Sequence, residues 1–329
     1  MINLAYERAT DPQDAIRRAA AVPRAAFIGG GTNLLDLMKA GVANPSLLVD
    51  INRLPLAGIV ELPNGGLRIG ALTRNSDTAN HAAVRDRYPL LSQALLAGAS
   101  PQLRNMATVG GNLMQRTRCY YFYDTAFQAC NKRAPGSGCA ALKGMNRIHA
   151  ILGASDQCVA TNPSDMSVAL AALRATVVVT GAQGERRIAM ADFHRLPGDT
   201  PQLDSNLAPG ELILGVDLPP SPFAAHAHYL KVRDRASYAF ALVSVAAALD
   251  LRDGVVQEAA IALGGVAHKP WRVVAAEQAL AGRPLGSTSM QAAAAALLEG
   301  AEPLEHNAFK LQLARRSIVR ALQVAGGIA

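Results

Sequence analysis

Hydrophobic and polar positions alternate in short blocks at the start of the chain, and each block predicts one element. Residues 6–22 space their apolar side chains as in a helix, with Thr10 as the expected N-cap. Residues 25–31 (AAFIGGG) predict a short buried strand that runs into a glycine turn. Residues 32–42 return to a helical pattern and residues 46–52 to a strand, so a small strand–helix alternation opens the chain.

The middle of the chain combines hairpin and helix patterns. Residues 58–71 alternate on both sides of Asn64-Gly65, a pair typical of a hairpin turn. Two helical patterns follow, and a further helix and hairpin come after a long irregular segment; these patterns cover residues 73–87, 89–99, 165–175 and 176–190. The proline-rich residues 196–222 predict the end of the first domain.

From about residue 223 the pattern changes to that of an antiparallel sheet with helices. Residues 238–251 and 255–267 predict two strands joined by a tight turn, and residues 290–301 and 307–327 predict helices. We therefore expect two domains, with the first divided into two subdomains; the bounds are 1–222 and 223–329, and about 1–55 and 56–222 within the first.

Residues 113–160 interrupt this regularity. The segment is loop-like, contains a Pro-Gly-Ser-Gly turn at 135–138 and holds all four cysteines of the chain, which are Cys119, Cys130, Cys139 and Cys158. We interpret it as an insertion that something other than a hydrophobic core holds together.

Composition fits a packed globular protein. Of the 329 residues, 50% are hydrophobic and only 17% are charged, which excludes a disordered chain and allows a large core in two domains. The net charge of +7 suits nucleic acid, but no run of five basic residues and no nucleic-acid-binding signature occurs. An acidic partner subunit or anionic cofactors explain the charge equally well, so we expect no nucleic-acid partner.

The sequence carries no targeting signal that we recognise. Its N-terminus lacks the basic start and apolar core of a secretory signal, and no apolar stretch is long enough to span a membrane. On its own the chain is expected in the cytoplasm, where its thiols would stay reduced and disulfides are not expected.

Two glycine-rich loops carry the strongest binding signal. Residues 27–35 (FIGGGTNLL) place three glycines where the backbone can approach a ligand, and Thr32 and Asn33 add a hydroxyl and an amide, which suits a pyrophosphate. Residues 99–113 (ASPQLRNMATVGGNL) offer a second Gly-Gly turn beside small hydrogen-bonding side chains. Each loop taken alone also fits a tight connection between secondary-structure elements. Two such loops in one domain favour a large cofactor such as FAD over a phosphate.

The four cysteines follow the pattern C-x10-C-x8-C-x18-C, which fits neither a zinc ribbon nor a ferredoxin. Four thiolates suit an iron–sulfur cluster or a zinc ion, and thiols without a common role are a third reading. Between residues 104 and 147, seven basic residues accompany a single acid, Asp124, a setting that stabilises an anionic cluster. Zinc with four thiolates is also anionic, so spacing and charge leave the choice open.

No catalytic constellation stands out, and we assign no catalytic residue to this chain. The seven histidines are scattered, without a zinc-protease motif or a serine-hydrolase elbow. His149 is expected at the surface or beside a metal ligand rather than as a ligand itself. Asp165 either caps the helix that follows it or serves a site, and a lysine placed like Lys231 is usually a solvated strand residue.

Taken in order, the motifs resemble the FAD-binding subunits of the molybdenum hydroxylases, the xanthine dehydrogenase and carbon monoxide dehydrogenase group, along nearly the whole chain. The matching segments are FIGGGTNLLDLMK, RIGALT, ASPQLRNMATVGGNL, SDMSVALAAL, GELILGVDLPP and KVRDRASYAFALVSVAAAL. The cysteine-rich insertion narrows the resemblance to the FAD subunits of bacterial periplasmic aldehyde oxidoreductases, which carry a 4Fe–4S cluster there. This chain has GGGTN where many members have AGGTD or AGGHS, a conservative difference because Asn still donates and accepts.

The resemblance implies an α+β fold with a two-subdomain FAD-binding domain of the vanillyl-alcohol-oxidase (PCMH) type. A C-terminal α+β domain with a three-stranded antiparallel sheet and helices would cover the flavin. The pyrophosphate would be bound by Phe27, Ile28, Gly29, Gly30, Gly31, Thr32, Asn33 and Leu34, and the second FAD loop would use Ser100, Asn105, Thr108, Gly111 and Asn112. The ribityl chain and ring would meet Asp165, Ile213 and Lys231, the lysine charge favouring reduced flavin. The 4Fe–4S cluster would be ligated by Cys119, Cys130, Cys139 and Cys158.

The function that the resemblance implies is electron transfer within a larger enzyme. A large partner subunit with a molybdenum cofactor would oxidise an aldehyde, and a small partner with 2Fe–2S clusters would pass electrons through FAD to an external acceptor. The three chains would form a heterotrimer or its dimer. The folded complex would reach the periplasm on a twin-arginine signal of a partner, with the cytoplasm as the alternative. Two other functions stay open, a stand-alone FAD reductase and a non-redox scaffold with a four-cysteine zinc site.

Overall fold

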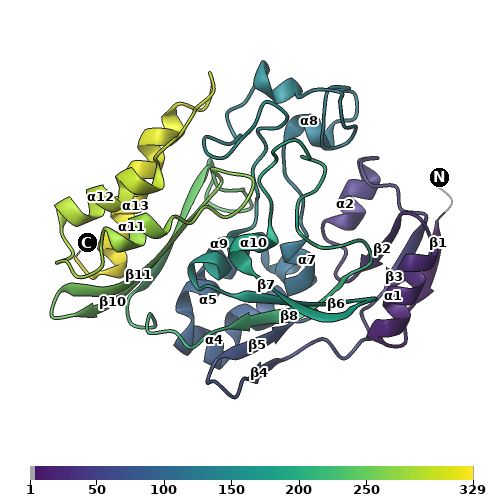
Figure 1. The fold of residues 1–329 in the computed structure, drawn as a ribbon, viewed down its shortest axis with the longest axis horizontal. Coiled ribbons are helices and arrows are strands. Elements are labelled where there is room, and N and C mark those ends of the chain that lie inside the picture. Colours follow the sequence, from purple (N-terminus) through teal and green to yellow (C-terminus); the bar gives the residue numbers. More distant parts are fainter. Residues whose placement is uncertain (1–3, 329) are drawn as a thin grey trace.

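Three β-sheets follow one another along the chain in the computed structural model, which describes residues 4–328 (Figure 1). The first is a parallel sheet in the order β1-β3-β2, formed by Ala5–Arg8, Leu47–Asp50 and Ala25–Ile28. Its central strand β3 is buried along its whole length, as its continuous apolar run predicts. Helix α2 (Leu34–Lys39) follows β2, so the expected strand–helix alternation is confirmed.

The first helix is shorter than predicted, because the residues before it form a strand of this sheet. Helix α1 (Pro12–Ala21) begins later than expected, and the residues before it form β1, which pairs with β3. Asp11 rather than Thr10 is the N-cap, because its side chain accepts a hydrogen bond from the backbone N–H of Asp14 at 2.8 Å. The expectation of a helix from residue 6 was wrong because the strand partner that decides its conformation is distant in the sequence.

The second sheet has five antiparallel strands in the order β4-β5-β8-β6-β7. They span Ile59–Glu61, Leu67–Gly70, Leu212–Leu218, Thr176–Gly181 and Gly184–Ala189. The hairpins expected at 58–71 and 176–190 are both present. Strand β8 occupies the centre of the sheet although it lies in the segment expected only to end the domain. Pro209 and Pro219 flank this strand, so they leave its hydrogen-bond ladder intact.

Short helices pack against this sheet and share its core. They are α3 (Asn75–Asn80), α4 (Ala82–Arg87), α5 (Pro89–Ala97), α7 (Val109–Leu113), α9 (Asp165–Ala172) and α10 (Met190–Phe193), whereas α6 (Pro101–Arg104) has no buried residue. The helix expected over residues 73–87 is divided, because His81 has an extended backbone between α3 and α4. Apolar side chains of α5, α7 and α9 meet those of β5, β6 and β8 in one core.

The segment expected as an insertion has little regular structure. Between α7 and α9, all of it described, it contains the one-turn helix α8 (Tyr120–Tyr123) and the 3-10 turn η1 (Ala140–Leu142). It does have a small apolar core, which includes three of the cysteines, Phe122 and, from α2, Leu37. The expectation that no hydrophobic core supports this segment is therefore corrected.

The third sheet has the three antiparallel strands expected for the C-terminal domain, in the order β11-β10-β9. These strands and the helices that follow are β9 (Ala227–Val232), β10 (Val243–Arg252), β11 (Val255–Gly264), α11 (Val274–Gln278), α12 (Ser287–Leu297) and α13 (Phe309–Ala325). Side chains of β10 alternate between two faces. Val245 and Leu249 pack with the three helices, whereas Ala246 and Ala248 join the core of the central sheet.

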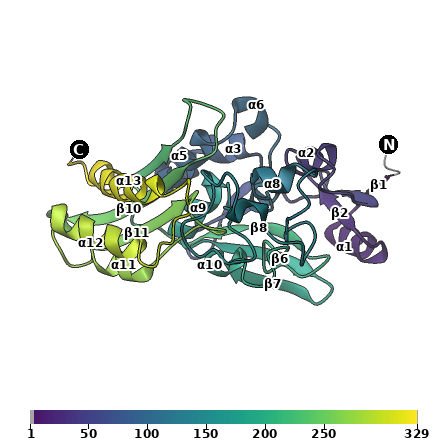
Figure 2. The same cartoon turned by 90° about the horizontal axis from the view of Figure 1, so that it is seen from above.

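The first and third sheets lie at opposite ends of the molecule, with the five-stranded sheet between them (Figure 1, Figure 2). The insertion lies between α2 and the C-terminal domain, since its small core is packed against Val42 and Ala43 on one side and Leu304 on the other. No helix within residues 4–328 has both the length and the apolar character needed to cross a membrane.

Candidate functional site

The two glycine-rich loops lie against each other. The first joins β2 to α2 and contains Gly30, and the second precedes α7 and contains Met106. A Cβ atom at Gly30 would lie 2.0 Å from the backbone oxygen of Met106, so only glycine permits this approach. We expected the glycines to make room for a ligand, but at Gly30 the close neighbour is the second loop itself.

Hydroxyl side chains fix the backbone of the second loop. Ser100 Oγ accepts a hydrogen bond from the first turn of α6 at 3.3 Å, and Thr108 Oγ1 accepts one from the backbone of Gly111 at 3.1 Å. Ser164 Oγ donates to Asn112 Oδ1 at 2.7 Å, which ties the loop to the start of α9. These contacts stabilise the conformation of the loop.

A cavity of about 1260 Å³ opens between the two loops and the segment that leads into β8. Among the expected site residues it is lined by residues 27–34, Thr108, Gly111 and Ile213. Ser100, Asn105 and Asn112 do not line it, and Asn105 is exposed. The volume exceeds that of a typical small-molecule pocket, so an extended ligand fits.

One wall of this cavity was missed by sequence reasoning. It is formed by His194, Arg195 and residues 202–209, which include Leu203 and Asp204. No motif marks this segment, and its place beside the glycine loops follows from the central position of β8. His194 is buried, and burial lowers its pKa to about 4, so a neutral ring contacts the carbonyl of Leu113 at 2.9 Å.

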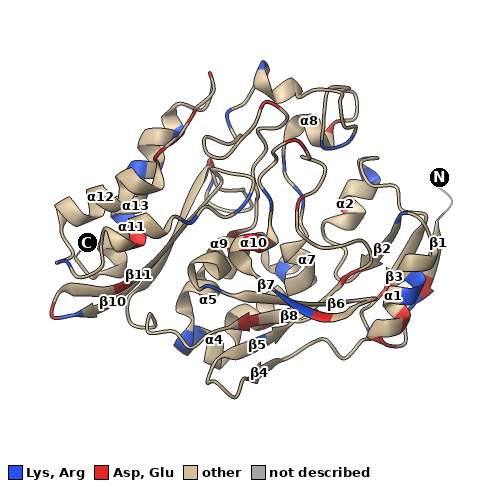
Figure 3. Ribbon diagram, in the orientation of Figure 1, with Lys and Arg blue, Asp and Glu red and all other residues tan. Residues whose placement is uncertain are grey.

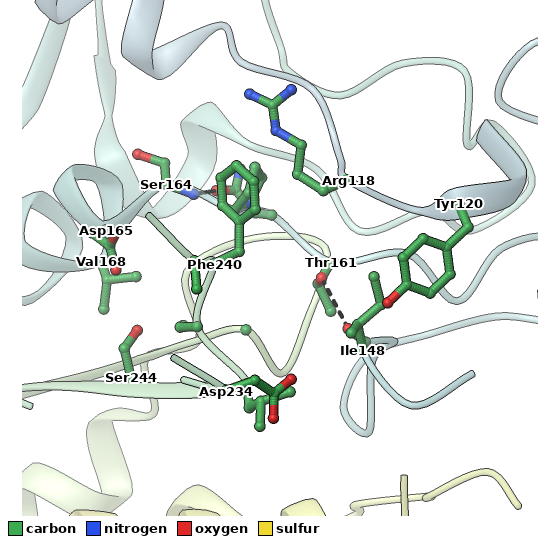
Figure 4. Close-up of a pocket in the computed structure, with 17 residues that line it drawn as sticks. Arg118, Tyr120, Ile148, Thr161, Ser164, Asp165, Val168, Asp234, Phe240 and Ser244 are labelled. Atoms are coloured by element: carbon green, nitrogen blue, oxygen red, sulfur yellow. Dashed lines mark hydrogen bonds between the residues drawn. The ribbon is translucent and has the colours of Figure 1, made fainter. Parts of the chain in front are cut away.

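A smaller cavity of about 200 Å³ lies between the insertion, the start of α9 and the C-terminal sheet (Figure 4). Arg118 comes from the insertion, Ser164 and Asp165 from the start of α9, and Phe240 from the loop between β9 and β10. Ser164 also bonds to Asn112 of the second glycine loop, so the two cavities are neighbours across α7.

Asp165 and Lys231 form a buried ion pair at the edge of the smaller cavity. Lys231 Nζ lies 2.7 Å from Asp165 Oδ2, and the two side chains are only 4% and 9% exposed. Tyr229 donates to the other carboxylate oxygen at 2.8 Å, and burial, with this carboxylate, raises its pKa well above the usual value. The cap of α9 is Ser164 and not Asp165. Lys231 is no solvated strand residue, and Asp165 neutralises its charge.

The side chain of Asn33 joins the first glycine loop to the insertion. Its Oδ1 accepts a hydrogen bond from the backbone N–H of Arg116 at 2.9 Å, and its Nδ2 donates to the hydroxyl of Tyr123 at 3.2 Å. Tyr123 in turn donates to Asp36 at 3.1 Å. The side-chain amide of Asn33 therefore binds the insertion. The presence of GGGTN in place of AGGTD or AGGHS does not suggest this contact by itself.

All four cysteines belong to the small core of the insertion, with three of them buried and Cys139 packed against it. Cys130 and Cys139 lie opposite each other in an antiparallel bridge. Cys119 Sγ lies 3.1 Å from Nε2 of His149, which is buried and not at the surface. Among residues 4–328, no group of three or more His, Cys, Asp or Glu side chains forms a ready-made site for a single metal ion.

Backbone amides surround the sulfur atoms. Burial raises the pKa of the Cys119 thiol to about 12, and hydrogen bonds from the amides of Phe122 and Tyr121 oppose that rise. The Cys158 thiol lowers the pKa of Cys139 to about 6, and three nearby amides also stabilise its thiolate. Amide–sulfur hydrogen bonds of this kind stabilise the thiolate ligands of iron–sulfur clusters.

The contact between Cys119 and His149 is not that of a catalytic pair. A nucleophilic thiol needs a lowered pKa, and burial raises that of Cys119 instead. Burial and the charge of Lys310 lower the pKa of His149 to about 4, so the ring is neutral. This pair therefore offers no nucleophile, and the absence of a catalytic residue from this chain stays a prediction.

Figure 3 marks the basic positions in blue and the acidic positions in red along the ribbon. Four of the six basic residues of the insertion form ion pairs with acids from other parts of the chain. Arg116 and Lys132 share Asp204, each at 2.6 Å. Further ion pairs join Arg118 to Asp36 at 3.2 Å and Arg147 to Asp234 at 2.8 Å. The sequence showed an unbalanced basic segment, but in the fold most of these charges anchor the insertion to its neighbours.

Comparison with known proteins identifies both parts of the chain. Residues 2–221 match the FAD binding domain in molybdopterin dehydrogenase, and residues 228–325 match the CO dehydrogenase flavoprotein C-terminal domain. The aldehyde oxidoreductase FAD-binding subunit PaoB of Escherichia coli strain K12 is 54% identical, over 97% of this chain and 97% of that protein. The glyceraldehyde dehydrogenase medium chain of Sulfolobus acidocaldarius is 28% identical, over 85% and 82%.

Solved structures share the fold over nearly the whole chain. Reconstituted CO dehydrogenase from Oligotropha carboxidovorans has a TM-score of 0.78 at 23% identity, and the aligned region covers 99% of this chain and 98% of that one. Quinoline 2-oxidoreductase from Pseudomonas putida 86 has a TM-score of 0.75 at 25% identity, with the same coverage. The expected α+β fold is confirmed, and the chain belongs to the FAD-binding subunits of the molybdenum hydroxylase family of oxidoreductases.

Proposed function

We propose that this chain is the electron-transfer flavoprotein subunit of a molybdenum-containing aldehyde oxidoreductase. The observation that carries the proposal is its 54% identity, over 97% of both chains, to a protein named as an aldehyde oxidoreductase FAD-binding subunit. Bound FAD supplies the chemistry, since it accepts electrons from one donor and passes them to an external acceptor. The chain itself supplies the binding site, the orientation and the surrounding charge.

The chain would work with two partners, a large subunit with a molybdenum cofactor and a small subunit with 2Fe–2S clusters, as a heterotrimer or its dimer. The names of its relatives support a multi-chain enzyme, because they describe a subunit, a medium chain and a subunit of a complex.

FAD would lie across both cavities. Its pyrophosphate and adenosine would occupy the large cavity, where the backbone from Phe27 to Leu34 lies near Thr108 and Gly111. Its ring would point to the smaller cavity, where the pair of Asp165 and Lys231 presents no net charge. Ile213 would line the passage, whereas Ser100, Asn105 and Asn112 would support the second loop rather than contact FAD directly. The first two subdomains would thus bind FAD and the C-terminal domain would cover its ring.

The four cysteines would hold a 4Fe–4S cluster, which adds a one-electron site to the chain. The residues present fit such a group because the sulfur atoms are gathered in one core and receive amide hydrogen bonds. His149 would contact one ligand without being a ligand. A four-cysteine zinc site is the competing occupant.

The complex would reside in the periplasm after co-export with a partner that carries a twin-arginine signal, because cofactors of this kind are inserted before export. The cytoplasm is the alternative. Osmotic-shock fractionation of the native host, followed by detection of this chain, separates the two. Recovery of the chain with cytoplasmic markers alone would reject the periplasmic proposal.

Metal and flavin analysis tests the two cofactors together. Anaerobically purified protein is expected to contain FAD and about four irons and four sulfides per chain. Cys130→Ser should lose the iron and lower the melting temperature, because the core of the insertion loses its central group, whereas the exposed Thr125→Ala should change neither. Flavin without iron would reject the cluster alone, and zinc without flavin would reject the redox function.

Substitution of Gly30 tests the loop contact that shapes the large cavity. In Gly30→Ala the new methyl group would meet the carbonyl of Met106, so the two loops must separate. We expect FAD occupancy to fall severalfold and the free energy of unfolding to drop by about 1–3 kcal/mol. Gly286→Ala is the matched control, because a Cβ there meets no atom within 4 Å. Full occupancy in Gly30→Ala, by absorbance of the purified protein, would contradict this account.

Asn33→Ala tests whether the insertion supports the FAD site. It removes the hydrogen bonds to Arg116 and Tyr123, which contribute about 1–3 kcal/mol together, so the dissociation constant for FAD should rise about tenfold. Tyr123→Phe should give a smaller rise, and the exposed Asn44→Ala should give none. Flavin fluorescence titration of the apoprotein measures all three. Equal affinities for Asn33→Ala and Asn44→Ala would show that the contact does not shape the site.

A further inference from the structure

Lys310 is a buried cation that neither the sequence patterns nor the proposed FAD site accounts for. It lies in the first turn of α13 and is 0% exposed. Its Nζ donates to the backbone carbonyls of His149 at 2.8 Å and Gly265 at 2.6 Å. Within residues 4–328 no carboxylate forms an ion pair with it, whereas the buried side chains of Lys132 and Lys231 are paired with Asp204 and Asp165.

A buried charge with only neutral partners is unfavourable. Carbonyl groups satisfy the hydrogen bonds of the ammonium group but do not replace the solvation that it loses. Burial, with the charge of Arg147, accordingly lowers the pKa of Lys310 to about 7. An apolar side chain would fill the same space at a lower free-energy cost. A lysine at this position therefore indicates a nearby anion other than the carboxylates of residues 4–328.

Lys310 is connected to Cys119 through His149. The carbonyl of His149 accepts hydrogen bonds from Lys310 and from Asn307 Nδ2, the second at 3.2 Å. The ring of the same residue places Nε2 3.1 Å from Cys119 Sγ, while its Nδ1 has no partner in the described structure. A single ring proton is therefore best placed on Nε2, where a ligand thiolate accepts it.

We propose that Lys310 is the buried counter-charge of the cysteine-bound group, and that His149, held in place by Lys310, donates its Nε2–H to Cys119 Sγ. This inference rests on the proposed 4Fe–4S cluster. Reduction adds one electron to a group that is already anionic, with no bond made or broken. A fixed positive charge and an N–H···S hydrogen bond both favour the reduced form and raise the reduction potential.

The test measures the reduction potential of the cluster, which a merely structural lysine would not change. The complex is purified anaerobically through a tag on this chain and titrated by EPR at the low temperatures where 4Fe–4S signals separate from those of 2Fe–2S clusters. Lys310→Gln removes the charge but keeps N–H donors for the two carbonyls, so its midpoint potential should fall while iron content is retained. Arg316→Gln removes an equal charge from an exposed position of α13 and should leave the potential unchanged.

A second variant separates the hydrogen bond from the charge. His149→Phe keeps an aromatic ring but removes the hydrogen-bond donor to Cys119, so the midpoint potential of the cluster should also fall. If Lys310→Gln fails to assemble, the potential of His149→Phe tests the inference instead. Unchanged potentials in both variants, with iron present, would overturn the inference. Wild-type protein without iron would instead show that the proposed cluster is wrong, and the inference would fall with it.

Discussion

The contact between Gly30 and the backbone of Met106 is the constraint on which the rest of the site depends. At this contact the glycine loop that follows β2 and the glycine loop that precedes α7 approach more closely than they could if residue 30 carried a side chain. The two loops then form two walls of the large cavity, and the segment leading into β8 forms the third. Because β8 is the central strand of the sheet, that third wall is fixed by the core of the domain and not by local loop structure.

The insertion is attached to this framework by polar contacts around a small core. Acids from three separate regions pair with four of its six basic residues, and Asn33 ties it to the first glycine loop. Helix α8 links the two candidate sites, since Cys119 precedes its first residue and Tyr123, its last, contacts Asn33. The aromatic run at 120–123 therefore contributes anchoring, with Phe122 in the core under the guanidinium of Arg116 and Tyr123 at the glycine loop.

The C-terminal domain approaches both candidate sites through buried lysines. Lys231 pairs with Asp165 beside the smaller cavity, and Lys310 holds the backbone of His149 beside the thiols. Burying these charged groups costs free energy, and removing one partner of such a contact destabilises the fold further. The buried lysines therefore favour one arrangement of the domain over other similar arrangements. Alanines on the facing side of β10 permit the close packing that brings these lysines into place.

The sequence by itself determined the early strand–helix alternation, the two hairpins of the central sheet, the two glycine loops, the irregular insertion and the presence of all four cysteines within it. These features are visible because periodicity, turn residues and composition act over a few neighbouring positions. Tertiary structure alone decided that residues 5–8 form a strand, that β8 lies at the centre of its sheet and that Asn33 serves the insertion. It also decided which charges are paired and that Lys310 is buried without a carboxylate partner among residues 4–328. Each of these depends on partners far away in the chain, such as the pair of Arg68 and Asp217, which are 149 positions apart. Local sequence does not record such pairings, because they form only when the sheets and their cores assemble.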